Sequence, residues 1–146
     1  MSSPFSRGRP KIWRERDTMK ALPHVWGAYR FREERGIAYI GITSNIYNRI
    51  SQHRSTQAYY DPEIHIIEFQ EAQLGVHWNS MCSWEKEKIF KHSPHLVTYI
   101  GGNGRRPAIE VNGEVIELRE DESVEDTLTR LGMFNRIGDF MSNLLR

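Results

Sequence analysis

The chain has 146 residues, 38% of them hydrophobic and 27% charged, which fits one soluble globular domain that buries about two-thirds of its unfolded surface. No apolar run approaches the ~20 residues that cross a bilayer, and no apolar segment follows the basic N-terminus, so we expect neither a membrane-spanning helix nor a secretory signal. The single cysteine, Cys82, excludes an internal disulfide and favours a reducing, cytoplasmic location.

The net charge of +1 conceals an uneven distribution along the chain. Residues 1–109 hold sixteen Lys and Arg against ten Asp and Glu, whereas residues 110–146 hold four against nine. A basic body is compatible with a polyanionic partner, but ordinary solvated charge explains the asymmetry equally well. The charge distribution alone therefore assigns no function.

Residues 1–22 are predicted to form a basic tail with a short helix that Pro10 opens. The sequence RGRPK at residues 7–11 resembles the core of an AT-hook, an extended segment that enters the minor groove of DNA. A plain flexible tail is the competing interpretation of so short a match. The candidate nucleic-acid contacts in this segment are Arg7, Arg9 and Lys11.

Two strands joined by a turn are predicted next, over residues 25–32 and 37–43. Successive side chains of a strand point to opposite faces, so the even-numbered apolar residues of the second strand share one face. Tyr39 and Gly41 share the other face, which leaves a phenol standing over a glycine.

A helix is predicted over residues 46–54, with Ser44 or Asn45 as its N-cap. Arg49 and His53 lie one turn apart on this helix, about 60° around the axis from an apolar pair of the same spacing. We therefore expect both polar side chains at the border of the buried stripe.

A third strand is predicted over residues 63–69 and a second helix over residues 80–92, which Pro94 ends. The helical spacing places Glu85 among the apolar residues and Glu87 on the opposite, solvent-facing side. Burial of a carboxylate costs free energy unless another group pairs with it. Glu85 therefore requires a functional or structural partner.

Residues 104–146 are predicted to complete the core or to mediate association between copies of the chain. Asn112-Gly113 is typical of a type I′ hairpin, a helix is capped near Ser123, and Gly132 breaks it. An amphipathic helix follows, whose apolar stripe suits the core or a homodimer contact. That stripe consists of Phe134, Ile137, Met141 and Leu144.

Several of these features occur in an ordered set. The triplet Gly-Ala-Tyr at residues 27–29 is followed by Tyr-Ile-Gly at residues 39–41, and then by Arg49 and His53 on the next helix. In this order and spacing they resemble the GIY-YIG nucleases. The family's metal-binding glutamate lies on a later helix, and Glu85 occupies the matching place.

The match around this glutamate extends to an isoleucine four residues on and to a proline beyond, here Ile89 and Pro94. The resemblance covers about residues 25–95, and as a set it is much more specific than either triplet. It implies a mixed α/β (α+β) fold with a small, largely antiparallel sheet and flanking helices. The nuclease core would then span residues 23–103.

The sequence departs from the family pattern at three places. The first triplet has Ala28 in its centre, and Ile42 follows the second triplet where some branches carry a lysine. Val97 stands about where a family asparagine is expected, which leaves Asn103 as a displaced candidate. With Arg105 and Arg106, Asn103 is also a candidate for contacts with the DNA backbone, although a plain loop explains this segment as well.

The resemblance implies a DNA endonuclease that depends on Mg²⁺ or another divalent cation such as Mn²⁺, with five catalytic side chains. Glu85 would hold the metal, and Arg49 would bind phosphate oxygens with its planar fork. Tyr29 would be the general base or would position the nucleophile, while Tyr39 would bond the phosphate or the water. His53 would relay a proton or orient Tyr29.

This assignment imposes a condition on the first two strands. Tyr29 and Tyr39 share a face only if the two residues pair directly or in a register shifted by an even number. We predict such a register, with a loop over residues 33–35 in the direct pairing.

Restriction-like, mobile-element or phage-associated, and repair functions all remain open. DNA is the expected partner, with a homodimer as one assembly, and the absence of a P-loop pattern predicts no nucleotide cofactor. The alternative function is a non-catalytic DNA-binding or partner-binding module on the same scaffold. Each tyrosine or arginine alone would be ordinary packing or solvated surface, so the nuclease prediction depends on the whole set.

Overall fold

A computed structural model describes residues 3–102, 105–111 and 113–132. This part of the chain forms two antiparallel sheets and three α-helices, which confirms the mixed α+β class. The four-stranded sheet has the order β1-β4-β2-β3, and the three-stranded sheet has the order β5-β6-β7. The strands are β1 (Lys11–Trp13), β2 (Gly27–Glu33), β3 (Gly36–Thr43), β4 (Ile66–Glu71), β5 (Thr98–Gly102), β6 (Arg105–Val111) and β7 (Glu114–Glu117). The helices are α1 (Ile46–Thr56), α2 (Trp78–His92) and α3 (Val124–Arg130), besides a 3-10 turn, η1 (Met19–Ala21).

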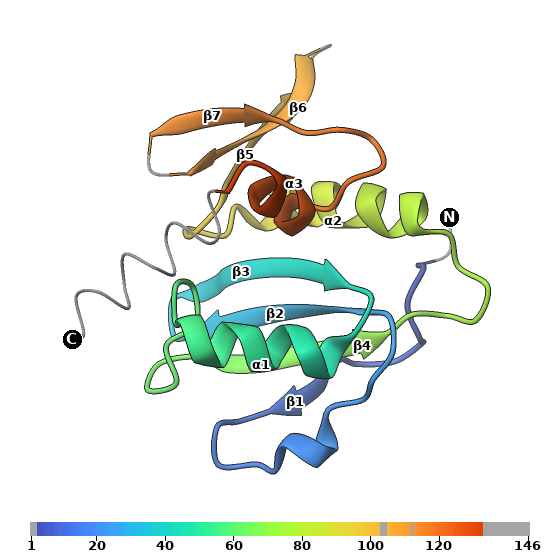
Figure 1. Cartoon of the computed structure of the whole chain (residues 1–146), viewed down its shortest axis with the longest axis vertical. Coiled ribbons are helices and arrows are strands. Elements are labelled where there is room, and N and C mark those ends of the chain that lie inside the picture. The colour runs from blue at the N-terminus through green and yellow to red at the C-terminus, as the bar shows by residue number, and fades with distance from the viewer. Residues whose placement is uncertain (1–2, 103–104, 112, 133–146) are drawn as a thin grey trace.

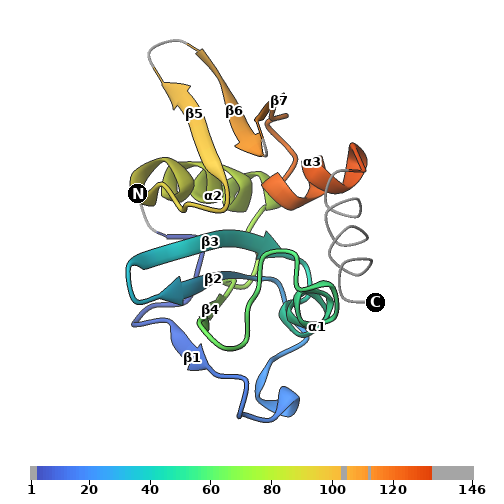
Figure 2. The same ribbon diagram turned by 90° about the vertical axis from the view of Figure 1, so that its left-hand side faces the viewer.

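The helices occupy two positions relative to the larger sheet (Figure 1). α1 packs against β2, whereas α2 and α3 pack against the edge strand β3. The smaller sheet lies beyond α2 and α3, so these two helices separate the sheets in both views (Figure 2). The edge of β3 is thereby covered rather than open to solvent.

The pairing of β2 with β3 meets the condition that the two tyrosines share a face. Tyr29 lies opposite Gly41, and Phe31 lies opposite Tyr39, a shift of two residues from the direct pairing of the tyrosines. The even-numbered form of the prediction is confirmed. A register shift after Phe31 precedes the turn, where Gly36 adopts a φ of +131°, a conformation that glycine tolerates without steric cost.

α1 begins as the sequence predicts and extends two residues further. Asn45 rather than Ser44 is the N-cap, since its side chain accepts a hydrogen bond from the Asn48 amide. Ile46 and Ile50 are fully buried beneath the helix.

The predicted helix from Pro10 to residue 22 is wrong. Residues 11–13 instead form β1 against β4, and only the three-residue η1 follows. Trp13 and Phe5 are buried, and the Ser6 amide donates to the Glu71 carbonyl. Two apolar anchors and an otherwise unpaired strand edge therefore outweigh the helix signal of Pro10.

The middle of the chain follows the prediction with shifted boundaries. β4 begins at Ile66 rather than at residue 63, because the His65 amide closes a turn on the Asp61 carbonyl. In α2, Glu85 is buried and Glu87 exposed, as the helical spacing predicts.

The C-terminal segment contains the predicted hairpin and helix start. β6 and β7 pair with Val111 opposite Glu114, and Ser123 caps α3 by accepting a hydrogen bond from the Asp126 amide. β5 was not predicted. Gly132 has a φ of +73°, in agreement with a break there, and the predicted amphipathic helix of residues 134–144 lies outside the described residues.

None of the helices in the described ranges has the length and apolar character needed to cross a membrane.

The N-cap of α1 yields a first prediction. Asn45→Ala should lower the free energy of unfolding by about 1 kcal/mol and the melting temperature by ~2–8 °C, because the Asn48 amide loses its acceptor. Asn48→Ala is the matched control, since this exposed side chain lies on the same helix and its amide stays capped. Thermal unfolding followed by circular dichroism measures both, and equal melting temperatures for the two variants would contradict the assignment of the cap.

Candidate active site

The structure brings the five predicted site residues together from four elements. β2 supplies Tyr29, β3 supplies Tyr39, α1 supplies Arg49 and His53, and α2 supplies Glu85. All are buried except Arg49, whose side chain is 19% exposed. Among the elements that carry them, α1 packs against β2, and α2 packs against the edge strand β3 (Figure 2). We refer to these five residues as the polar cluster.

The two tyrosine rings and His53 form the aromatic part of the cluster. The rings of Tyr29 and Tyr39 are stacked with centroids 6.2 Å apart, and Tyr29 Oη lies 2.7 Å from His53 Nε2. A Cβ atom at Gly41 would lie 2.5 Å from Tyr29 Oη, which is closer than non-bonded atoms approach. Glycine at this position therefore leaves the space in which the phenol sits.

A sixth residue, Glu125 of α3, lies at the centre of the cluster. Tyr39 Oη donates to Glu125 Oε1 over 2.9 Å, and His53 Nε2 lies 3.2 Å from the same oxygen. The other oxygen, Oε2, lies 2.9 Å from Arg49 Nε. The carboxylate of Glu125 is fully buried, so these three side chains surround it directly.

Sequence reasoning missed Glu125, although a signal for it exists. Glu125 follows Ser123 in the first turn of α3, beside the fully buried Val124 and Leu128. An inward carboxylate on an apolar helix face was the same observation that singled out Glu85. Within a segment rich in acidic residues, Glu125 was not distinguished from solvent-exposed charge.

Glu85 holds the edge of β3 and the start of α3 together. Its Oε2 accepts from the Ile42 amide over 3.1 Å, and its Oε1 accepts from the Val124 amide over 2.8 Å. Burial raises the pKa of Glu85 to about 8, although these two hydrogen bonds lower it. The neutral carboxyl is therefore favoured at neutral pH in this conformation.

The protonation states of the aromatic groups follow from burial. Burial, together with the neighbouring Arg49, lowers the pKa of His53 to about 3, so the imidazole is neutral at neutral pH. A neutral imidazole accepts a proton at one ring nitrogen, and the phenol of Tyr29 lies in hydrogen-bond contact with it. Burial, with the charges of Tyr59 and Glu85, raises the pKa of Tyr39 well above its ordinary value, so Tyr39 remains a hydrogen-bond donor.

The arrangement around Glu85 does not fit a hydrated divalent cation. Mg²⁺ requires near-octahedral coordination by about six oxygen ligands, usually with several waters among them. Both oxygens of Glu85 accept backbone amides, and α3 occupies the adjacent space through Val124. Among the residues that the structure describes, no group of three or more His, Cys, Asp or Glu side chains is arranged to hold a metal ion.

Four of the residues predicted to bind nucleic acid have side chains that the structure describes, and none of these four joins the polar cluster. The three N-terminal ones are exposed on the segment that leads into β1, at the opposite edge of the sheet: Arg7, Arg9 and Lys11. Arg106 is 84% exposed on β6 and lies 3.8 Å from Glu117. Asn103 and the side chain of Arg105 lie outside the described part of the chain.

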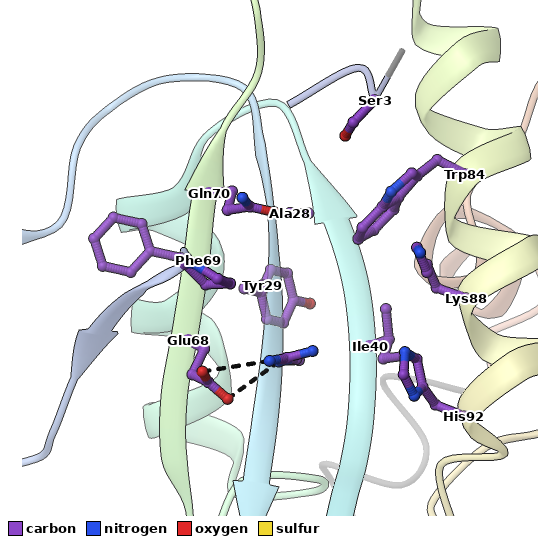
Figure 3. Close-up of a pocket in the computed structure, with 12 residues that line it drawn as sticks. Ser3, Ala28, Tyr29, Ile40, Glu68, Phe69, Gln70, Trp84, Lys88 and His92 are labelled. Atoms are coloured by element: carbon purple, nitrogen blue, oxygen red, sulfur yellow. Dashed lines mark hydrogen bonds and ion pairs between the residues drawn. The ribbon is translucent and has the colours of Figure 1, made fainter. Parts of the chain in front are cut away.

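A pocket with a volume of about 240 Å³ lies on the other face of the sheet (Figure 3). Trp84, Lys88 and His92 point into it from successive turns of α2. Arg30 lines it from β2 and, as the neighbour of Tyr29, points away from the face of the tyrosine rings. No residue of α1 or α3 lines this pocket, but Tyr29 of the polar cluster does, so the pocket borders the cluster at that residue.

The model of one protein family, described as the GIY-YIG catalytic domain, matches residues 25–95. No curated protein and no solved structure matches the chain. The matched region contains β2, β3, α1, β4 and α2, and thus all five residues of the polar cluster. It ends before β5, so α3 and Glu125 lie outside it.

The buried carboxyl of Glu85 yields a pH-dependent prediction. A carboxyl whose pKa is about 8 in the folded chain and near its ordinary value in the unfolded chain contributes stability that is lost as the pH rises toward 8. Between pH 5 and 8, the free energy of unfolding of the wild type should therefore fall relative to that of Glu85→Gln, by on the order of a few kcal/mol. Urea unfolding at several pH values measures the difference.

Glu87→Gln is the control, since Glu87 lies on the same helix and is exposed. It should follow the wild type across this pH range. Parallel pH profiles for the wild type and Glu85→Gln would contradict the buried, neutral state of Glu85.

Proposed function

Since the chain carries a GIY-YIG nuclease domain over residues 25–95, we propose that it is a metal-dependent endonuclease that hydrolyses phosphodiester bonds in DNA. The observation that carries this proposal is the gathering of two phenols, a guanidinium and an imidazole around the carboxyl group of Glu125, whose pKa is raised well above its ordinary value by burial. Phosphodiester hydrolysis requires a proton acceptor and donors that neutralise charge on the phosphoryl oxygens. The polar cluster contains both.

Arg49 and Tyr39 are the groups that we propose to bind the scissile phosphate. In the structure they contact the two oxygens of a carboxylate at 2.9 Å each, and a phosphate presents oxygens of the same charge and reach. The guanidinium offers planar N–H donors, and Tyr39 stays a hydrogen-bond donor because its pKa is raised well above its ordinary value.

Tyr29 and His53 are the groups that we propose to handle the proton. The neutral imidazole of His53 lies 2.7 Å from Tyr29 Oη through its Nε2, and this hydrogen bond orients the phenol toward the attacking water. His53 is thus a positioning residue that acts through Tyr29.

Glu85 is the residue that we propose as the ligand of Mg²⁺ or Mn²⁺. A bound cation of this kind supplies charge stabilisation to the phosphate and the leaving oxygen. Because both carboxylate oxygens accept backbone amides in this structure, we derive no step through the metal.

A non-catalytic DNA-binding or partner-binding module is the second candidate function. The observation that favours it is the complete burial of Tyr39, His53 and Glu85, because a scissile phosphate cannot reach them in this conformation. Restriction-like, mobile-element or phage-associated, and repair functions are all compatible with the endonuclease.

Nicking of supercoiled plasmid in the presence of Mg²⁺ or Mn²⁺ tests the proposal. Tyr29→Phe and Glu85→Ala are each expected to reduce the nicking rate by about 10²-fold or more, because each removes a group required by the chemistry. Tyr47→Phe on α1, the helix of Arg49, and Glu87→Ala on α2, the helix of Glu85, are matched controls. Both variants should nick at the wild-type rate.

Equal nicking by the wild type, Tyr29→Phe and Glu85→Ala would contradict the proposed chemistry. The non-catalytic module would be favoured if the wild type binds DNA but does not nick it with either metal. The same result would be required of Glu125→Ala, which removes the carboxyl group that contacts Tyr39.

A further inference from the structure

The first turn of α3 occupies the polar cluster. The Val124 amide donates to Glu85, and the next residue, Glu125, contacts Tyr39, Arg49 and His53. Two consecutive residues of one helix therefore engage the metal-ligand candidate and the phosphate-binding candidates at the same time.

The contacts of Glu125 are those that a phosphate would make. Its carboxylate is anionic when ionised, and it offers one oxygen to the Arg49 guanidinium and the other to the Tyr39 hydroxyl. Arginine binds carboxylate and phosphate with the same planar donors, so the two anions compete for the site. Glu125 Oε1 would also lie 2.7 Å from a Cβ at Gly41, which places this oxygen against the glycine and beside Tyr29 Oη.

The hydrogen bond from the Val124 amide to Glu85 affects the ability of Glu85 to bind a cation. Coordination of a cation requires free lone pairs and space for the other ligands of the ion. The Val124 amide lies 2.8 Å from Glu85 Oε1 and takes one of those lone pairs, while α3 fills the adjacent volume. The docked α3 thus accounts for one of the two amide contacts that occupy Glu85, while the Ile42 amide of β3 accounts for the other.

We propose that α3 is an autoinhibitory segment, in which Glu125 occupies the place of the scissile phosphate and the Val124 amide blocks Glu85. DNA phosphate, together with the divalent cation, displaces it. This inference rests on the proposed nuclease function. It also explains why a catalytic domain has its central side chains buried: the segment that covers them lies outside the matched region of residues 25–95.

The way α3 is held suits a displaceable element. α3 has seven residues; it packs against β3 and α2, buries Val124 and Leu128, and reaches α1 through Glu125. The loop before it is fixed to α2 by Lys86, whose Nζ donates to the Arg119 carbonyl over 2.5 Å. Because Lys86 anchors the loop rather than the helix, α3 can leave the cluster while its tether stays in place.

Two substitutions weaken the docked state by different routes. Glu125→Ala removes the carboxylate, while Val124→Pro removes the amide donor to Glu85. Proline is tolerated at Val124, which is the first residue of the helix, and the extended backbone of Ser123 before it (φ −70°, ψ 163°) is compatible with a following proline. Glu120→Gln is the matched control, because it removes an acidic side chain from the exposed end of the loop that leads into α3.

The experiment measures nicking of supercoiled plasmid by the full chain with Mg²⁺, and Mn²⁺ binding by electron paramagnetic resonance without DNA. If docking of α3 is worth 1–3 kcal/mol, release should raise the nicking rate by about 5- to 150-fold. Glu125→Ala and Val124→Pro should both show this increase and should bind Mn²⁺ more tightly than the wild type. Glu120→Gln should match the wild type in both measurements.

The opposite result identifies α3 as a structural or positioning element. If folded Glu125→Ala, or the size-matched Glu125→Gln, nicks DNA no faster than the wild type and binds Mn²⁺ no more tightly, autoinhibition is wrong. If Glu125→Ala binds Mn²⁺ and DNA more tightly but never cuts, the cover is real and the nuclease proposal fails. Adding Glu85→Ala to Glu125→Ala should abolish both the gained activity and the gained Mn²⁺ binding.

Discussion

The structure depends on one buried interaction, the contact of the Glu125 carboxylate with Arg49, Tyr39 and His53. An arginine whose side chain is 81% covered and a fully buried glutamate would each be costly alone, and together they compensate one another only in part. Hydrophobic side chains in the same place would often stabilise a fold more. An ionic and hydrogen-bonded centre at this place therefore points to a role other than stability, and three of its four residues lie in the region that the family model matches.

The parts of the site that lie on one element were predictable from local geometry. Because side chains alternate between the two faces of a strand, Tyr39 and Gly41 of β3 share a face. Because Arg49 and His53 are one helical turn apart, they are neighbours on α1. The burial of Glu85 follows from the same periodicity in α2. Periodicity within one strand or helix does not show that residues of different elements meet. The order of the motifs along the chain allowed this to be predicted, because the resembled family implies how the elements are arranged in space.

The parts that could not be predicted depend on contacts between distant segments. Glu125 lies 86 residues from Tyr39, and although its place on the apolar face of α3 indicates burial, nothing in the local sequence indicates which side chains it contacts. β1 forms because β4 offers a free edge and Trp13 an apolar anchor, so the helix signal at Pro10 is overruled by tertiary pairing. In each case the decisive partner lies on another element.

The docking of α3 on the polar cluster is the central claim, and amide hydrogen exchange at Val124 tests it most directly. In the free protein this amide donates to a buried carboxylate and should be protected. Saturation with duplex DNA in the presence of Ca²⁺ should increase its exchange while amides in β2 and β3 stay protected. An exchange rate at Val124 that is unchanged or lower in the DNA complex would contradict the displacement of α3 by substrate.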